Sequence, residues 1–388
     1  MRTYSLEFKL SAFALAAVSA AIGGNACAQA TAPLVVKIGH VAPTSGPAAH
    51  WGRDYELGAK MAVDDLNAKG VKIGDRTVKV ELIAEDDAND PKQATTAANK
   101  LVDSKVNGVI GHGGSGTTIP ASRIYSDAGI PQISAASTNP KYTRQGFATA
   151  FRLVADDVQL GSTLGKYAVD TVKAKTFVVV DDRTAYGQGV ADEFKKAVLA
   201  KGGVVAGHEF TNDRATDFLS ILTKLKAVKP DVLFFGGLDS QAGPMLKQMK
   251  QLGFDVKFMG GDGVCTIALT KLAGDAVGES KVICAEAGGV DGESKDSLEK
   301  FKQAFKAKNG VDVQIYSPYI YDAVNVMVDA MVKAGSSDPK KYLPALKKTD
   351  YKGITGPIMF DEKGDLKNAA LTLYTYKSNQ KTQIAVVR

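Results

Sequence analysis

The chain has little cysteine, histidine and tryptophan: 3, 4 and 1 of these residues in 388. Three cysteines are too few for a disulfide-built scaffold. The four histidines are scattered, with no H-E-x-x-H motif and no Cys/His cluster, so we expect no metal site. Proline is also scarce, at 13 against 39 glycines, and the glycines follow no collagen period. The hydrophobic fraction of 45% is ordinary for a globular protein, and the length predicts two domains or one large one.

A large excess of charge of one sign is missing as well. The 48 Lys and Arg residues face 42 Asp and Glu residues, for a net charge of +6. Lysines are mixed with acids along the expected helices, as in residues 192–196. We find no basic run of five or more and no zinc-finger, basic-zipper or RNP-type motif, so we expect no nucleic-acid partner.

No hydrophobic run is long enough to cross a membrane, which takes about 20 residues. The longest, residues 10–22, follows Arg2 and Lys9 and precedes the small-residue site Ala28-Gln29-Ala30. This order of segments predicts a secretory signal peptide, residues 1–30, cleaved after Ala30. The mature protein is therefore expected to be exported and soluble.

The cysteines leave two alternatives open. Cys27 stands in a poor lipoprotein box, so we expect it to leave with the signal peptide rather than to carry a lipid. Cys265 and Cys284 remain, an even number in an oxidising compartment, where a structural disulfide is favoured. The alternative is two separately buried thiols.

Strand and helix patterns alternate after Pro33. Apolar runs predict strands over residues 34–39, 78–84, 106–111, 129–134, 177–180, 204–210, 231–235 and 257–260. Helices are expected over residues 55–68, 90–102, 185–201, 217–227 and 241–251. Continuous apolar runs are typical of parallel strands covered on both faces. The number of strand–helix units is larger than one sheet comfortably holds, so we expect two doubly wound α/β lobes.

Ligands bind such sheets at the carboxyl ends of the strands, so we expect the functional residues in the loops there. Loop 111–118 matches G-x-G-x-x-G but lacks the acid about 20 residues on that a dinucleotide site needs. It is neither a P-loop nor a nucleophile elbow. Its glycines, the Ser115 hydroxyl and a following helix N-terminus favour a small anion such as a carboxylate. The alternative is a glycine-rich turn in which Ser115 caps the helix.

Two further loops complete a pattern of opposite charges. Loop 133–140 offers the Ala136 carbonyl and the N–H and hydroxyl of Thr138, or simply a helix N-cap. Asp262 stands between two glycines after a strand, which would expose its carboxylate, unless it forms an Asx-turn. An anion-binding loop in one lobe and a carboxylate in the other predict a receptor for a zwitterion.

The enzyme interpretation has little support. His112 lies three positions before Ser115 on a tight loop, where the pair cannot easily reach attack geometry with a third orienting group. We expect no enzyme and no cofactor. Trp51 and Tyr186 follow strand-end loops, and each is expected either to line an apolar pocket or to pack in the core.

These motifs, in their order and spacing, resemble a known family. The matching segments include Ser45-Gly46-Pro47, Asp90-Pro91-Lys92-Gln93, Gly111-His112, Tyr186-Gly187, Phe258-Met259-Gly260 and residues 359–366. Over residues 36–367 the chain resembles the periplasmic branched-chain amino-acid binding proteins, the Leu/Ile/Val-type substrate-binding components of ABC transporters. The resemblance implies a type I periplasmic binding fold: two doubly wound parallel-sheet lobes joined by a three-segment hinge.

The resemblance also implies lobe boundaries, site residues and partners. The first lobe would hold residues 31–155 plus 286–370, and the second residues 156–285 plus 371–388. Ser115 and Thr138 would hold the ligand carboxylate, and Ala136, Thr138 and Asp262 its ammonium group. The remaining ligand-binding candidates are Trp51, Gly113, Gly114, Ser137, Tyr186, Leu238 and Tyr316. The protein would be a periplasmic monomer that delivers an amino acid to a membrane permease.

Departures from the family pattern leave the ligand's side chain open. Family members often carry Tyr at Trp51, Glu at Asp262, Tyr at Leu238 and Phe at Tyr316, and bulkier residues at the two loop glycines. An aromatic amino acid, an amide or another small carboxylate is therefore the alternative ligand, and sensing is the alternative role. The family's disulfide in the first lobe would need Cys at Ala88 and Gly114, so a Cys265–Cys284 bridge would be a different one.

Overall fold

A computed structural model describes residues 1–3, 32–290, 292 and 294–387. Residues Pro33–Arg388 form one compact unit. The predicted cleavage site after Ala30 and Cys27 lie outside the described residues. Within the described ranges, no helix is both long and apolar enough to cross a bilayer.

The first of two large sheets has six strands in the order β2-β3-β1-β4-β5-β6. They are β1 (Leu34–Ala42), β2 (Lys72–Ile73), β3 (Arg76–Asp86), β4 (Gly108–Gly111), β5 (Gln132–Ser134) and β6 (Ala150–Arg152). All pair in parallel except β2, which is antiparallel to β3. We call this sheet and the helices around it the first lobe.

The second sheet has seven strands in the order β15-β14-β11-β10-β9-β7-β8. They are β7 (Thr176–Asp181), β8 (Val204–Phe210), β9 (Val232–Gly236), β10 (Lys257–Gly260), β11 (Val282–Glu286), β14 (Leu371–Lys377) and β15 (Gln380–Val387). The sequence patterns did not predict β14 and β15, which form an antiparallel hairpin along β11. The two residues between them, Ser378 and Asn379, have φ of 48° and 58°, as a tight hairpin turn requires. This sheet and its helices are the second lobe.

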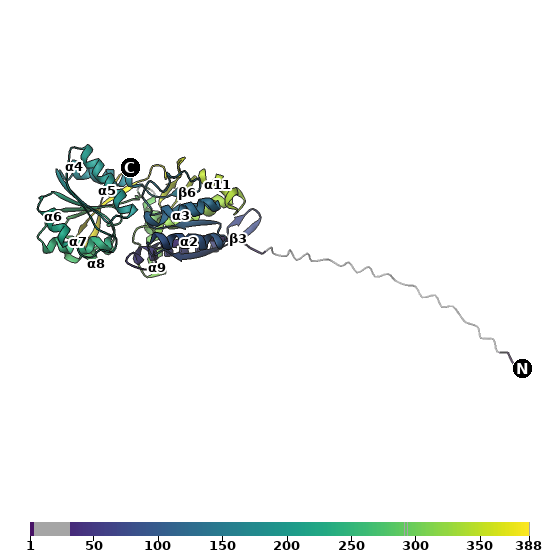
Figure 1. The fold of residues 1–388 in the computed structure, drawn as a ribbon. Helices are drawn as coiled ribbons and strands as arrows, with labels where there is room; N and C mark the ends of the chain where they lie inside the picture. The colour runs from purple at the N-terminus through teal and green to yellow at the C-terminus, as the bar shows by residue number, and fades with distance from the viewer. Residues whose placement is uncertain (4–31, 291, 293, 388) are drawn as a thin grey trace. The chain divides into compact units, whose positions relative to one another are not determined.

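Eleven α-helices lie in the described residues (Figure 1). Those of the first lobe are α1 (Ala49–Lys69), α2 (Pro91–Asp103), α3 (Ser115–Ala128), α9 (Ser294–Asn309), α10 (Ser317–Ala334) and α11 (Pro339–Lys347). Those of the second are α4 (Asp157–Asp170), α5 (Ala185–Ala200), α6 (Leu219–Lys226), α7 (Asp239–Gln251) and α8 (Ala268–Ala273). A 3-10 helix (Gly274–Val277) and the small hairpin of β12 (Tyr351–Gly353) and β13 (Gly356–Ile358) complete the elements.

Local sequence signals explain several helix ends. The Asp90 side chain accepts hydrogen bonds from the backbone N–H groups of Lys92 and Gln93, and Pro91 occupies the first turn. Two starts differ from the prediction. Helix α1 begins at Ala49 rather than near Tyr55, and α3 begins at Ser115 itself, with Gly114 as its N-cap. Trp51 and Tyr55 therefore share one helix, and Ser115 opens another.

The parallel strands of the two lobes have the same order. It is β3-β1-β4-β5-β6 in the first lobe and β8-β7-β9-β10-β11 in the second. In each, the chain reverses its direction of travel between the first and third parallel strands, at the β1/β4 and β7/β9 junctions. The carboxyl ends of strands beside such a reversal form a crevice that binds ligands.

The chain passes between the lobes three times: between β6 and α4, after β11 and before β14. Hydrogen bonds tie these passages together. The Ala155 N–H donates to the Ala287 carbonyl at 3.0 Å, and the Gln159 side chain donates to the Ala369 carbonyl at 2.9 Å. The predicted fold class, two doubly wound lobes joined by three segments, is confirmed.

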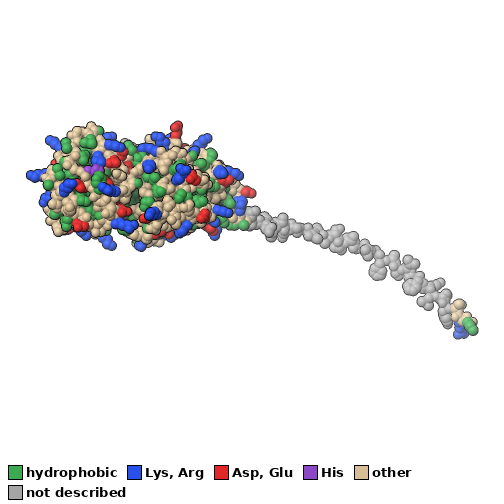
Figure 2. Space-filling view, in the orientation of Figure 1, with side chains coloured by type: hydrophobic (Ala, Val, Ile, Leu, Met, Phe, Trp, Pro, Cys, Tyr) green, Lys and Arg blue, Asp and Glu red, His purple; other side chains and the backbone are tan. Residues whose placement is uncertain are grey.

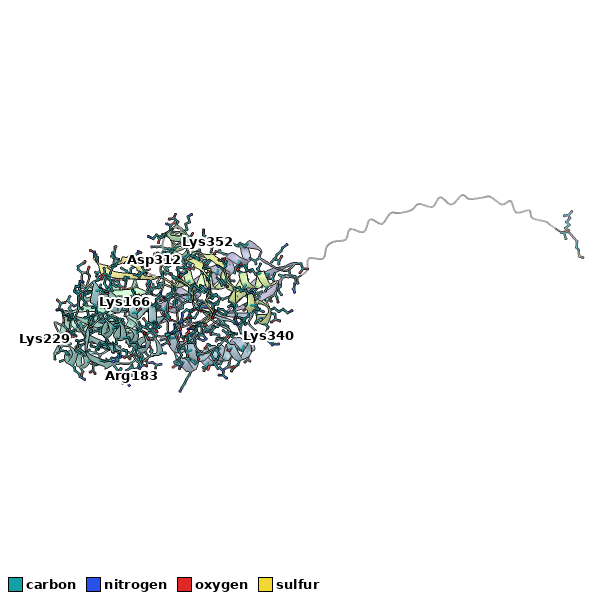
Figure 3. The ribbon with its side chains drawn as sticks, turned by 90° about the horizontal axis from the view of Figure 1, so that it is seen from above. Lys166, Arg183, Lys229, Asp312, Lys340 and Lys352 are labelled. Carbon is teal, nitrogen blue, oxygen red and sulfur yellow. A yellow bond between two sulfur atoms is a disulfide. The ribbon has the colours of Figure 1, made fainter. Side chains whose placement is uncertain are left out.

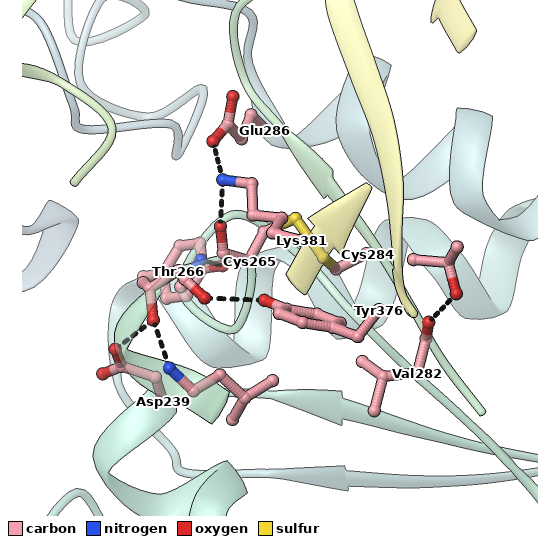
Figure 4. Close-up of a disulfide and its surroundings, with 12 residues drawn as sticks. Asp239, Cys265, Thr266, Val282, Cys284, Glu286, Tyr376 and Lys381 are labelled. Carbon is pink, nitrogen blue, oxygen red and sulfur yellow. Dashed lines mark hydrogen bonds and ion pairs between the residues drawn. A yellow bond between two sulfur atoms is a disulfide. The ribbon is translucent and has the colours of Figure 1, made fainter. Parts of the chain in front are cut away.

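Cys265 and Cys284 form a disulfide, with Cα atoms 5.3 Å apart. The sequence left a bridge and two free thiols open, and the bridge is confirmed. It ties the loop after β10 to strand β11 (Figure 4). The Lys381 ammonium beside it bonds the Cys265 carbonyl and the Glu286 carboxylate.

Charged side chains of both signs are mixed over the surface in view (Figure 2). Lys229 and Lys340 lie toward opposite ends of the molecule rather than in one cluster (Figure 3). Many lysines pair with acids on the same element, such as Lys302 with Glu299 at 2.8 Å. Exposed pairs of this kind contribute only about 0–1 kcal/mol each to stability.

Candidate functional site

A cavity of about 510 Å³ lies where strand-end loops of the two lobes meet. From the first lobe it is lined by residues that follow β1, β3, β4 and β5 and by Tyr316 before α10. From the second lobe it is lined by residues that follow β7, β8, β9 and β10. Both reversal points of the sheets therefore face the same space. Nine of the eleven predicted ligand-binding residues line it: Trp51, Gly113, Gly114, Ser115, Ala136, Tyr186, Leu238, Asp262 and Tyr316.

The first-lobe wall is built around the N-terminus of α3. Ser115 is the first helical residue and is almost fully buried. Its Oγ accepts hydrogen bonds from the Asn139 N–H at 3.1 Å and from the Ser137 hydroxyl at 3.3 Å. The N–H groups of Ser115 and Gly116 precede any carbonyl that the helix could offer them, whereas that of Thr117 donates to the Gly114 carbonyl at 3.2 Å. Together with the helix dipole they favour a negatively charged group at this wall.

The two remaining predicted residues, Ser137 and Thr138, do not line the cavity but lie behind Ser115, fully buried. Ser137 orients Ser115 through the hydroxyl contact given above. The Thr138 carbonyl accepts from the Asp157 N–H at 2.8 Å. Burial raises the pKa of the Asp157 carboxyl, and the nearby Thr138 hydroxyl opposes this shift.

Gly113 and Gly114 serve close packing. A Cβ at Gly113 would lie 2.7 Å from the Tyr55 ring, and one at Gly114 would lie 2.5 Å from the Asn89 side-chain oxygen. Both distances are shorter than packed atoms tolerate. The glycines thus admit Tyr55 and Asn89 to the cavity wall, a role that the sequence did not indicate.

Asp262 provides the charge on the second-lobe wall. Its Oδ2 accepts a hydrogen bond from the Tyr316 hydroxyl at 2.6 Å. Among the described residues, Oδ1 has no hydrogen-bond partner. Burial raises the pKa of this carboxyl to about 6, against the opposing effect of the Tyr316 and Tyr186 hydroxyls. A buried acceptor without a partner is costly, so Oδ1 is a ready site for a positively charged donor.

The sequence explanation for the glycines beside Asp262 is wrong. They were expected to expose the carboxylate, yet Asp262 is only 3% exposed. A Cβ at either Gly261 or Gly263 would lie 2.7 Å from the Tyr186 side chain. The glycines make room for that ring, whose hydroxyl accepts a hydrogen bond from the Gly263 N–H at 2.8 Å.

Aromatic rings form the apolar part of the wall. The Trp51 and Tyr316 ring centroids lie 6.2 Å apart, and those of Tyr55 and Tyr316 lie 6.0 Å apart. Tyr316 is held in place by Asp54, one turn beyond Trp51 on α1. The Asp54 carboxylate accepts from the backbone N–H groups of Gln314, Ile315, Tyr316 and Ser317.

His112 does not contact Ser115 in the way a catalytic pair would. Its Nδ1 lies 2.8 Å from the Asp87 carboxylate, and its Nε2 lies 3.1 Å from the Tyr125 hydroxyl. Both ring nitrogens are thus occupied behind the cavity wall. In the described part of the chain, no group of three or more His, Cys, Asp or Glu residues is placed to hold a metal ion.

Sequence reasoning missed several wall residues. Tyr55 lies one turn after Trp51, a spacing that could have placed it on the same helix face. Asp182 directly follows β7 and lines the cavity near Tyr186. Its Oδ1 accepts from the N–H and hydroxyl of Thr184, and burial raises the pKa of this carboxyl to about 6. No sequence signal pointed to Asn89.

The sequence profile of the periplasmic binding protein family matches residues 35–381. This chain belongs to that family. A leucine-, isoleucine-, valine-, threonine- and alanine-binding protein of Pseudomonas aeruginosa is 37% identical over 90% of this chain and 92% of its own length. Leu/Ile/Val-binding protein homolog 1 of Brucella abortus is also 37% identical, over 95% of both chains.

Solved structures of family members agree with this fold. The leucine-binding protein LivK of Thermotoga maritima superposes with a TM-score of 0.83 at 27% identity, covering 91% of this chain and 99% of its own. The substrate-binding protein LivJ of Streptococcus pneumoniae, in complex with isoleucine, gives 0.82 at 26% identity, with the same coverage.

Proposed function

We propose that this protein binds a hydrophobic amino acid, with a branched side chain, in the periplasm and delivers it to an ABC permease. The names of the relatives support this class of ligand, and so does the isoleucine complex of the pneumococcal protein. The secretory signal, with cleavage after Ala30, belongs to the same proposal. The protein acts as a monomer and as a receptor rather than an enzyme.

One observation supports the proposal most. The unpartnered Oδ1 of Asp262 and the N-terminus of α3 border the same cavity from opposite lobes. An α-amino acid carries one positive and one negative group that match these two poles. Ser115 holds the carboxylate, and Ala136 and Asp262 hold the ammonium group, whereas the predicted Thr138 does not line the cavity. Burying both charges is tolerable because each is paired.

The rest of the wall sets the side-chain preference. Trp51, Tyr186, Leu238 and Tyr316 border the cavity and offer mainly apolar surface. A leucine, isoleucine or valine side chain gains roughly 1.5–3 kcal/mol on full burial against such groups. Closure of the two lobes about the three connecting segments buries the ligand, and the closed form docks on the permease. The lobes divide at the predicted boundaries near residues 155, 285 and 370.

Calorimetric titration and thermal shift against all twenty amino acids test the proposal. Leucine, isoleucine and valine are expected to bind and to raise the melting temperature. A ligand at a hundredfold excess over Kd adds about 2.7 kcal/mol of stability. For variants of the site, Asp275→Asn is a matched control, because this carboxylate is exposed and pairs with Lys250 in the same lobe. No shift with any hydrophobic amino acid would refute the proposal.

A further inference from the structure

Asp239 joins the two lobes outside the groups assigned to the ligand. It is the first residue of α7 and is fully buried. From its own lobe, the Thr266 hydroxyl donates to Oδ2 at 2.5 Å. From α1 of the first lobe, His50 Nε2 lies 2.9 Å from Oδ2, and the Trp51 indole N–H donates to Oδ1 at 3.3 Å.

The second-lobe side of this contact is braced. The Asp239 N–H donates to the Gly263 carbonyl at 2.7 Å. The Tyr376 hydroxyl donates to the Thr266 carbonyl at 2.7 Å, and the adjacent Cys265 is held by the disulfide (Figure 4). Asp239 therefore keeps its place with respect to the Asp262 loop whether or not the first lobe is near.

The first-lobe side differs, because His50 and Trp51 reach Asp239 only while the lobes are together. The His50 side chain is 29% exposed, whereas that of Asp239 is not exposed at all. Opening the cleft removes His50 and Trp51, two of the three side-chain donors, from the Asp239 carboxylate and exposes that carboxylate to water. Trp51 also borders the cavity, so the bond to Asp239 orients one wall of the pocket in the closed form.

We propose that Asp239 is a positioning residue that latches the closed form, with His50 and Trp51 as its partners across the cleft. Neither Asp239 nor His50 lines the cavity, so both act on bound ligand through closure. The effect of this latch on ligand release rests on the proposed function. Its effect on lobe closure applies also to the ligand-free protein.

Ligand release is the first test, with leucine as the probe in stopped-flow fluorescence. We expect Asp239→Ala to speed leucine dissociation about tenfold and His50→Ala about threefold, with little change in association rate. The double variant should release leucine no faster than Asp239→Ala alone, because both changes break one contact. Additive effects, or unchanged dissociation in both single variants, would overturn the latch. Asp275→Asn serves again as the control.

Lobe separation without ligand is the second test. Spin labels on Lys60→Cys in α1 and Lys247→Cys in α7 report the distance between the lobes by pulsed electron paramagnetic resonance. Asp239→Ala and His50→Ala should both shift the distance distribution to longer values. If Asp239→Ala fails to fold, His50→Ala still decides, since its side chain is partly exposed.

The two tests separate the two proposals. A wild-type protein that ignores leucine, with variants that widen the lobe distance, contradicts the proposed function and supports the latch. A wild-type protein that binds leucine, with variants that change neither dissociation nor distance, contradicts the latch alone.

Discussion

The two lobes share one strand order but present opposite electrostatic character to the cavity. The first lobe offers the N-terminus of α3, glycines and small side chains, with Ser115 at the centre. The second lobe offers carboxylates after two of its strands: Asp182 after β7 and Asp262 after β10. Equivalent topology provides equivalent positions at the strand ends. The residues placed there decide which charge each wall accepts.

The acids of the second lobe keep unused hydrogen-bonding capacity. Burial raises the pKa values of Asp182 and Asp262 to about 6. In the described structure, each retains one buried oxygen without a partner. The Ser115 oxygen in the first lobe, by contrast, accepts two hydrogen bonds. Both unpartnered carboxylate oxygens can therefore accept a hydrogen bond from a bound ligand.

Removing the acidic pole should have the largest effect. Asp262→Ala is expected to weaken leucine binding about a hundredfold, because it leaves the buried ammonium group unpaired. Asp262→Asn keeps the size of the side chain and an acceptor for Tyr316 but loses the negative charge. It therefore shows how much of the affinity depends on that charge. Isothermal titration calorimetry measures both, and wild-type affinity in Asp262→Ala would show that this pole does not bind the ligand.

Removing the Ser115 hydroxyl from the first-lobe wall should have a smaller effect on leucine affinity. Ser115→Ala is expected to weaken leucine binding about tenfold, since the helix N-terminus and backbone N–H groups remain. The same calorimetric titration applies. Ser126→Ala, in the last turn of the same helix, is the matched control and should bind normally. Equal affinities for both variants would argue against a carboxylate at Ser115.

Lowering the pH should reduce the negative charge of the second-lobe wall, because it protonates Asp182 and Asp262. The ligand-free pKa of Asp262 is raised from 3.8 to about 6, and binding of the ammonium group requires the ionised form. Affinity should therefore fall as pH decreases, about twofold at pH 6 and about tenfold at pH 5 relative to neutral pH. Leucine stays zwitterionic over this range. The decrease should be smaller in Asp262→Asn, where Asp182 still titrates near pH 6, and a flat wild-type profile would contradict the assignment.

Particular residues show how far sequence reasoning reached. Ser115 and Asp262 could be found because apolar runs located the strands, and ligands bind at strand ends. The helix that carries Trp51 began earlier than its apolar spacing suggested, since the first turn of α1 holds few buried apolar residues to mark it. Strands β14 and β15 were missed, and so were β11 and β6, the latter only three residues long.

The sequence by itself determined the class of fold, the export signal as a prediction, and the two poles. These features can be recognised from residues that are close together in the sequence, since hydrophobic periodicity and strand-end residues are local patterns. Only the tertiary structure decided that the glycines at 113, 114, 261 and 263 admit Tyr55, Asn89 and Tyr186. It also decided that Asp239 meets His50 from 189 positions away. Such contacts depend on how two separately wound sheets meet, and no local pattern encodes that meeting.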